Sequence, residues 1–333
     1  MLKNIENKQQ NTQISDASSA ILVVDEASEG QRIDNFLQKM LKGVPKSHIY
    51  RILRSGEVRV NKKRIDADFR LSLEDQVRVP PIRISTIKSV ASASTQAKFN
   101  DAIIYEDDAM LVINKPSGFA VHGGSGVSRG VIEQLRMERP QAKFLELVHR
   151  LDRDTSGVLM LAKKRSALVA LHEAIRNNWM DKRYVMMVHG QWQEKKKHVT
   201  LDLQKYVTNT GERRVNVVTN PEKDKHNESQ ISETIFYLSK QIGDYSLLEA
   251  KLITGRTHQL RVQLAHLGFP ILGDDKYGDF ALNKALVKKG LKRMFLHSSE
   301  TNIRHPITGE KLKLSAPLPE ELKKFINVLE SNH

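Results

Sequence analysis

The stretch that decides the fold reads His149-Arg150-Leu151-Asp152-Arg153-Asp154-Thr155-Ser156-Gly157. One apolar run, 144–148 (FLELV), precedes it and another, 158–162 (VLMLA), follows it. The charged stretch is therefore predicted to be a loop between two buried strands. Ionisable side chains between core elements are costly unless they pair with one another or face a ligand. A turn stabilised by Arg–Asp pairs and a functional loop both satisfy this condition.

The composition indicates a folded protein with more than one domain. The chain has 333 residues, with 53 Lys and Arg against 39 Asp and Glu, a net charge of +14 and a pI near 9.7. Such an excess of positive charge attracts a polyanion, either nucleic acid or an acidic membrane surface. The absence of cysteine excludes disulfides, thiolate catalysis and Cys-ligated metal sites.

No segment of the sequence is typical of a membrane or secreted protein. The longest apolar runs have about five residues against the roughly 20 that span a bilayer, and the N-terminus lacks the apolar core of a signal peptide. The lack of cysteine fits a reducing compartment. We therefore expect a cytoplasmic protein with no membrane partner.

A small basic module is predicted over residues 20–82, after a polar, disordered tail at 1–19. One helix is expected around 33–41, where apolar residues share a face. A second short helix, with Ser47 as its predicted cap, turns Ile49, Ile52 and Leu53 inward. Alternating strands are expected at 57–61 and 76–79.

Positive charge concentrates on the second helix and on the turn between the two strands. A basic run is often only a solvated face, but two consecutive elements contribute this one, which is typical of a nucleic-acid-binding surface. The residues expected to bind RNA are Arg51, Arg54 and Lys62. Through residues 32–37, 47–56 and 58–61 the module resembles an S4 RNA-binding domain, a helix–helix–hairpin unit.

A second domain is predicted over 101–333, after a linker at 83–100. Strands are expected at 103–105, 110–114, 185–188, 231–238 and 246–253, and helices at 166–179 and up to residue 267. A glycine-rich loop at 118–130 lacks the Lys-Ser/Thr ending of a nucleotide-binding loop. Because strands and helices do not alternate regularly, the predicted fold class is α+β with a mixed, largely antiparallel sheet.

Three separated segments offer complementary chemical groups, namely Arg150 with Asp152, Lys182 with Tyr184, and Arg256 with His258 and Arg261. A nucleophilic carboxylate must stay ionised in a water-poor pocket, and a nearby Arg favours its charged form. Arginine also suits phosphates, and a Tyr ring offers a face on which a base can stack. Taken singly, Tyr184 is more typical of a strand residue that packs its ring, and Arg261 is as compatible with a surface helix charge as with a ligand contact.

In combination these segments make the chain resemble the RluA-type pseudouridine synthases. The resemblance covers about residues 22–330 and rests on the S4-like module, the 149–157 stretch and the motifs at 114–118 (NKPSG), 121–124 (VHGG), 182–184 (KRY), 255–262 (GRTHQLRV), 273–278 (GDDKYG) and 296–297 (LH). It implies that Asp152 is the catalytic aspartate, that Arg150 displaces the target uridine, that Tyr184 stacks on the flipped base and that Arg261 pairs with Asp152. Gln263 and Arg183 depart from the family pattern, with possible consequences only for target choice.

The resemblance implies isomerisation of uridines to pseudouridine in large-subunit ribosomal RNA. The base leaves its stack, N1–C1′ breaks and C5–C1′ forms. Because there is no net redox change or hydrolysis, we expect no nicotinamide, metal or nucleotide cofactor. A monomer is also expected. Lys182, Arg256 and His258 are expected to contact RNA. Asp152 could attack C1′ or remove the 2′ proton, and Tyr184 or a water that it holds could take the C5 proton.

Other functions agree less well with the sequence. A metal-dependent hydrolase could draw on His149, Asp152, Asp154, His258, His266 and His297, but their spacing matches no known ligand motif. A glycosidic hydrolase would need Asp154 as a second carboxylate, and Asp154 is expected to pair locally instead. The alternative from another class is a non-catalytic S4-type RNA-binding or ribosome-assembly protein.

Overall fold

The computed structural model describes residues 19–41, 44–82, 98–123, 129–209, 211–219 and 229–331. The chain divides into two compact units, Met1–Ala91 and Ser92–His333. The predicted tail up to residue 18, the predicted linker over 83–97, most of the 221–230 loop and part of the 118–130 loop lie outside the described residues.

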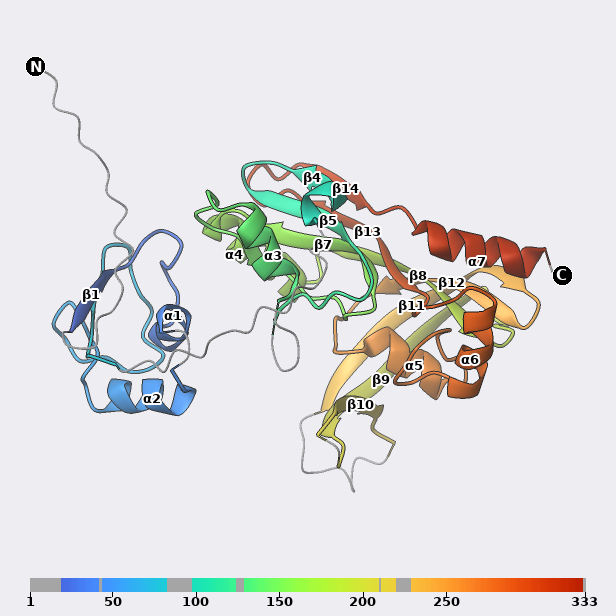
Figure 1. The fold of residues 1–333 in the computed structure, drawn as a ribbon, viewed down its shortest axis with the longest axis horizontal. Helices are drawn as coiled ribbons and strands as arrows, with labels where there is room; N and C mark the ends of the chain where they lie inside the picture. Colours follow the sequence, from blue (N-terminus) through green and yellow to red (C-terminus); the bar gives the residue numbers. More distant parts are fainter. Residues whose placement is uncertain are drawn as a thin grey trace, which may run out of the picture. The chain divides into compact units, whose positions relative to one another are not determined.

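The first unit is a three-stranded antiparallel sheet with two helices (Figure 1). Its elements are β1 (Ala20–Val23), α1 (Ile33–Met40), α2 (Lys46–Arg54), β2 (Arg59–Val60) and β3 (Gln76–Val79), with strand order β1-β3-β2. The predicted inward face of α2 is confirmed, and so is that of α1 apart from Met40, which is exposed near the end of its helix while Ile33, Phe36 and Leu37 are buried. The prediction that Ser47 caps α2 is wrong. The helix begins at Lys46 after Pro45, whose ring fixes φ near the helical value.

The second unit is built on an eleven-stranded sheet. Its elements in chain order are η1 (Phe99–Ala102), β4 (Ile103–Glu106), β5 (Met110–Lys115), α3 (Val131–Glu138), β6 (Glu146–Leu147), β7 (Ser156–Ala162), α4 (Arg165–Arg176), β8 (Asp181–His189), β9 (Lys196–Val207), β10 (Arg213–Val217), β11 (Ser229–Ile242), β12 (Tyr245–Leu252), α5 (Gln259–His266), α6 (Phe280–Lys288), β13 (Leu296–Arg304), β14 (Lys311–Ser315) and α7 (Glu320–Glu330).

The sheet runs in the order β10-β9-β11-β12-β8-β13-β7-β5-β4, with β14 paired to β13 and β6 to β7. Its pairs are antiparallel apart from β7 with β13. The predicted α+β class with a mixed, largely antiparallel sheet is therefore confirmed. Figure 1 shows α3 and α4 near β4, β5 and β7, whereas α5 and α6 lie near the long strands β9, β11 and β12. Within the described ranges, no helix is long and apolar enough to cross a membrane.

The predicted helix at 166–179 is correct in place and wrong in extent. Leu171 is buried against β7, as its apolar stripe predicts. The helix ends at Arg176, Asn178 adopts a left-handed φ of 55°, and the Trp179 side chain is 66% exposed. Asn tolerates that conformation, so the chain turns before Trp179 can join the stripe.

Candidate active site

The charged 149–157 loop runs from β6 into β7, between two strands as predicted. Leu151 is buried and anchors the loop in the core, while Asp152 follows it with a side chain that is 27% exposed. The Oδ2 atom of Asp152 accepts a hydrogen bond of 3.0 Å from Nη1 of Arg261 in α5. The two residues predicted to pair are thus in contact, although 109 positions separate them in the chain.

Arg261 is held from behind by Asp274, to which sequence reasoning assigned no role. Its Nε and Nη2 donate to the two carboxylate oxygens of Asp274, both at 2.7 Å, and Nη2 also reaches Asp275 at 3.3 Å. The side chains of Arg261 and Asp274 are 4% and 1% exposed. A bidentate pair of this kind fixes the plane of the guanidinium, which leaves Nη1 directed at Asp152.

Burial and pairing act in opposite directions on this charge cluster. Burial favours the neutral forms of Arg261 and Asp274, but their mutual hydrogen bonds and attraction prevail. The net result is a raised pKa for Arg261 and a lowered pKa for Asp274. Both groups are charged at neutral pH, so Asp152 faces a permanent cation.

Strand register brings Tyr184 to the same place. Tyr184 in β8 lies opposite Ser298 in β13, and Ser298 lies opposite Gly157 at the end of the charged loop. A β-carbon at position 157 would clash with the Ser298 carbonyl oxygen, and the φ of Gly157 is +112°, so only glycine fits. Burial raises the pKa of Tyr184 to about 12, which keeps its hydroxyl protonated.

A cleft of about 920 Å³ opens over Asp152. Its charged lining is mostly basic and comprises Arg150, Arg153, Arg176, Lys182, Arg256, Arg261 and Lys276, with Asp152, Asp154, Glu212 and Asp275 as the acidic members. His258 also lines it. Tyr184 borders a small hollow of about 60 Å³ that shares Arg150, Asp152 and Arg261 with the cleft. The predicted residues of the second unit therefore converge on one basic cavity, which suits a polyanionic substrate.

Lys182 and Arg150 reach the cleft in different ways. Burial lowers the pKa of the Lys182 ammonium, which lies 3.6 Å from where a β-carbon on Gly255 would stand. Arg150 is exposed at the rim. Arg256 is also exposed, with Nε donating to the Ile231 carbonyl at 3.0 Å. His258 Nε2 lies 3.9 Å from Asp152 Oδ2.

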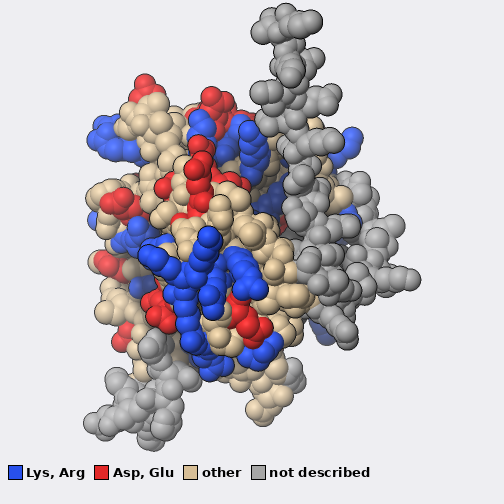
Figure 2. Space-filling view, turned by 90° about the vertical axis from the view of Figure 1, so that its left-hand side faces the viewer, with Lys and Arg blue, Asp and Glu red and all other residues tan. Residues whose placement is uncertain are grey.

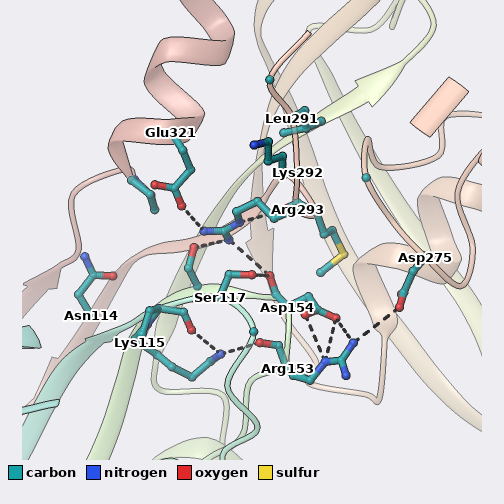
Figure 3. A pocket seen from close by; sticks show the side chains of 17 residues that line it. Asn114, Lys115, Ser117, Arg153, Asp154, Asp275, Leu291, Lys292, Arg293 and Glu321 are labelled. Carbon is teal, nitrogen blue, oxygen red and sulfur yellow. Dashed lines mark hydrogen bonds and ion pairs between the residues drawn. The ribbon is translucent and has the colours of Figure 1, made fainter. Parts of the chain in front are cut away.

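The loop is held from its other side by Lys115 and Ser117, which lie at the end of β5 and just after it (Figure 3). The Nζ atom of Lys115 donates to the carbonyls of Pro116, Phe119 and Arg153 at 2.9–3.0 Å, and burial lowers the pKa of this ammonium to about 7. Ser117 donates to the Asp154 carbonyl at 2.8 Å. These bonds fix the carbonyls of Arg153 and Asp154, the two loop residues that follow Asp152.

Arg293 completes this clamp in a second cavity of about 790 Å³, which shares Arg153, Asp154 and Asp275 with the cleft. Its Nη2 donates to Ser156 Oγ at 2.7 Å and its Nη1 to Glu321 of α7 at 3.1 Å (Figure 3). Asp154 pairs with its neighbour Arg153 at 3.3 Å, the local partnership predicted for it. The walls of this cavity thus mainly brace the 149–157 loop.

The basic residues predicted on the first unit are exposed at its surface. Arg51 and Arg54 lie on the outward side of α2, and Lys62 lies in the turn after β2 with a left-handed φ of 68°. Arg51 makes one exposed ion pair, with Glu57 at 3.3 Å. Figure 2 shows Lys and Arg side chains gathered on the face turned to the viewer.

Two of the histidines considered for a metal site, His149 and His297, make hydrogen bonds within the protein. His149 Nε2 accepts a hydrogen bond from the Met160 N–H, and His297 bonds to Ser156 and to the Ala316 carbonyl. Burial lowers the pKa of both imidazoles to about 4. In the part of the chain that the structure describes, no three His, Asp or Glu side chains are grouped as metal ligands would be.

Comparison with known proteins identifies the family. The model of the RNA pseudouridylate synthase family matches residues 109–266, and that of the S4 domain matches 31–77. The chain is 50% identical over 315 residues to the ribosomal large subunit pseudouridine synthase C of Salmonella typhi, covering 93% of this chain and 96% of the relative. The chain belongs to the RNA pseudouridylate synthase family.

Other relatives of the synthase support the same assignment. The proteins of that name from Escherichia coli K12 and Pasteurella multocida are 50% and 48% identical to it, with 92% and 97% of this chain covered and 95% and 98% of theirs. Among solved structures, Human RNA Pseudouridylate Synthase Domain Containing 4 matches with a TM-score of 0.54 at 25% identity, covering 69% of this chain and 94% of its own. The family prediction and the enzyme prediction are confirmed, and the non-catalytic alternative is set aside.

The two departures from the family pattern lie away from Asp152 in the synthase. Gln263 is fully buried in α5 and donates to Ser232 Oγ at 3.0 Å. Arg183 pairs with Asp181 of its own strand, at 2.8 and 3.0 Å. The most important residue that sequence reasoning missed is Asp274. Its motif was noted for resemblance, but only the fold shows that its carboxylate supports Arg261.

Proposed function

We propose that this synthase converts uridines of large-subunit ribosomal RNA to pseudouridine. The names of its bacterial relatives support this substrate, and so does the basic cleft. The observation that carries the proposal is the chain Asp152–Arg261–Asp274, in which a buried ion pair directs a guanidinium N–H at the Asp152 carboxylate in the cleft.

The proposed chemistry begins at Asp152. N1–C1′ breaks with its electron pair on the uracil, the ring turns, C5–C1′ forms, and the C5 proton leaves while N1 gains one. Asp152 either attacks C1′ or removes the 2′ proton, and in both cases it must be anionic. Arg261 supplies a fixed cation that donates to this carboxylate at 3.0 Å.

Tyr184 is proposed to stack on the flipped base. Its ring lies beside Asp152 in the small hollow, where an aromatic face can pair with uracil. Because burial raises its pKa to about 12, the hydroxyl is a poor base at neutral pH. We therefore assign removal of the C5 proton to a water held by Tyr184 rather than to a phenolate.

The cleft-lining cations are proposed to hold the RNA strand. Arg150 at the rim is suited to occupy the place of the displaced uridine, and Arg256 is suited to a backbone phosphate. Burial lowers the pKa of Lys182 and so disfavours its charged form. A phosphate beside this ammonium would stabilise the charge. His258 is proposed to contact the target nucleotide.

The first unit is proposed to supply affinity for large RNA. Arg51, Arg54 and Lys62 are exposed, which suits salt-dependent contacts to phosphates. We propose the division into a tail at 1–19, an S4 domain at 20–82, a linker at 83–100 and a catalytic domain at 101–333. Since one chain supplies every proposed catalytic residue, we expect the protein to act as a monomer. We also expect that it works in the cytoplasm and that the reaction needs no cofactor.

The test is replacement of Asp152 by Asn. We expect turnover, followed as loss of the C5 label from RNA carrying 5-tritiated uridine, to fall by about 10⁴-fold or more, the scale for removal of a catalytic nucleophile. RNA affinity should change little. The control is Asp101→Asn at an exposed aspartate of the same unit. Normal turnover in the Asp152 variant would refute the proposal, and mapping pseudouridines in ribosomal RNA with and without the gene would identify the targets.

A further inference from the structure

Tyr277, in the segment between α5 and α6, joins the active site to the β9–β10 hairpin through two hydrogen bonds. Its hydroxyl lies 2.9 Å from the backbone nitrogen of Val215 in β10. The same hydroxyl lies 2.8 Å from Nδ1 of His258. No role was assigned to Tyr277 by the sequence argument or by the proposed function.

The direction of these two bonds follows from counting protons. A backbone N–H can only donate, so the Tyr277 oxygen accepts from Val215. Burial raises the pKa of Tyr277 to about 12, so the hydroxyl keeps its single proton. That proton is left to be donated to Nδ1 of His258, and Nδ1 therefore acts as an acceptor.

The charge state of His258 then fixes its tautomer. Burial lowers the pKa of His258, although Asp152 acts in the opposite sense, so the imidazole is neutral at physiological pH. A neutral imidazole that accepts at Nδ1 carries its proton on Nε2. The result is a defined N–H donor on the side of the ring that faces Asp152.

This donor has no acceptor within hydrogen-bond distance among the described residues. Nε2 lies 3.9 Å from Asp152 Oδ2, too far for a hydrogen bond. The His258 side chain is only 15% exposed, and it lines the cleft in which the target nucleotide is proposed to sit. A polar hydrogen directed into a substrate cavity in this way indicates an acceptor on the substrate.

We propose that Tyr277 is a positioning residue that holds His258 as its Nε2–H tautomer, so that this N–H donates to O2 of the target uracil. This inference rests on the proposed function. O2 is bonded to the carbon next to N1, so it lies close to the C1′ on which Asp152 acts. When N1–C1′ breaks, the electron pair that stays on the uracil is shared between N1 and the ring carbonyl oxygens. A preorganised donor at O2 lowers the energy of that state more than that of bound uridine.

The ring of Tyr277 has a second neighbour, which determines the choice of variant. The Arg261 guanidinium lies 5.2 Å from the ring centroid, a cation–π contact that a Phe would keep. Tyr277→Phe therefore removes only the hydroxyl. The matched control is Tyr105→Phe, because the Tyr105 hydroxyl also makes one short bond, to Asp107 at 2.7 Å, and Tyr105 does not line the cleft.

The first experiment records the imidazole ¹⁵N resonances of the full-length protein without RNA. Comparison with a His258→Asn variant assigns the signals. We expect an acceptor-type Nδ1 and a protonated Nε2 for His258 in the wild type and in Tyr105→Phe, and a mixture of tautomers in Tyr277→Phe. A wild-type His258 protonated at Nδ1 would overturn the inference. Because no turnover is needed, this result is independent of whether the proposed function holds.

The second experiment measures kcat and KM on saturating RNA. We expect Tyr277→Phe to lower kcat by about tenfold with little change in KM, somewhat less than removing a whole transition-state donor. In a His258→Gln background, where the side-chain N–H cannot change tautomer, adding Tyr277→Phe should change kcat less than twofold. An equal loss in both backgrounds would show that Tyr277 acts elsewhere and would refute the inference. Substrate with 2-thiouridine at the target position carries a weaker acceptor. If O2 is the partner, this substrate should lower kcat clearly in the wild type and much less in Tyr277→Phe. An equal loss in both proteins would refute the assignment to O2.

Discussion

Asp274 and Asp275 offer a matched pair of substitutions, because adjacent carboxylates contact the same guanidinium from different environments. Asp274 is 1% exposed and makes two bonds of 2.7 Å to Arg261, whereas Asp275 is 56% exposed and makes one of 3.3 Å. Breaking a buried pair costs roughly 3–5 kcal/mol, and an exposed pair contributes below about 1 kcal/mol. Since Asp152 and Asp275 would still face Arg261, we expect about 3 kcal/mol for Asp274→Asn.

The assay is equilibrium unfolding in urea, followed by tryptophan fluorescence. The two tryptophans of the chain, Trp179 and Trp192, both lie in the second unit, so the signal follows the unit that contains the pair. With an m-value of about 3 kcal/mol per M, Asp274→Asn should lower the urea midpoint by about 1 M and Asp275→Asn by less than about 0.3 M. Equal shifts in the two variants would refute the argument that burial of the pair decides its energetic weight.

The same pair predicts a dependence on pH. Burial raises the pKa of Asp274 and pairing with Arg261 lowers it, and the net pKa in the folded protein lies below the ordinary value of an aspartate. A carboxylate whose pKa is depressed by folding contributes stability above its unfolded pKa and loses it as the pH falls through the folded value. The stability difference between wild type and Asp274→Asn should therefore be full at pH 6 and shrink below about pH 4. A difference that grew on acidification would contradict this sign.

Three further predictions concern the loop and the first unit. Gly157→Ala should destabilise the protein by at least about 3 kcal/mol in the same urea assay, because the new methyl meets the Ser298 carbonyl of β13. The control is Gly118→Ala, which also has a positive φ but has open space around it, and it should cost only about 1 kcal/mol. Lys115→Met should lower kcat and leave RNA affinity unchanged, since its three carbonyl bonds hold the loop; a weakened affinity with normal kcat would contradict that role. The last variant neutralises Arg51, Arg54 and Lys62 together. On large RNA it should reduce the slope of log affinity against log salt by about 2–3, while turnover on a short saturating oligonucleotide stays nearly intact.

Much of the local structure could be read from side-chain periodicity. The apolar spacing around Ile33 and Ile49 predicted α1 and α2, and strict alternation predicted β3 at Gln76–Val79. Element ends were less predictable, as Trp179 illustrates, because a single left-handed residue ends a helix whatever the stripe beyond it. The strands β1, β9, β10, β13 and β14 were not predicted. Lys196–Val207 carries several exposed charges, so its pattern is weak.

The sequence by itself determined which chemical groups the site would use. The 149–157 stretch, with its apolar flanks, predicted a charged loop between strands, and its motif pointed to Asp152, Arg261 and Tyr184. Only the tertiary structure decided how those groups meet. Asp152 and Arg261 are 109 residues apart, and the pairing of β7, β13 and β8 brings Tyr184 beside them. Asp274 and Tyr277 acquire their roles in the same way, because a side chain's direction depends on packing between distant segments, which local patterns of residues do not encode.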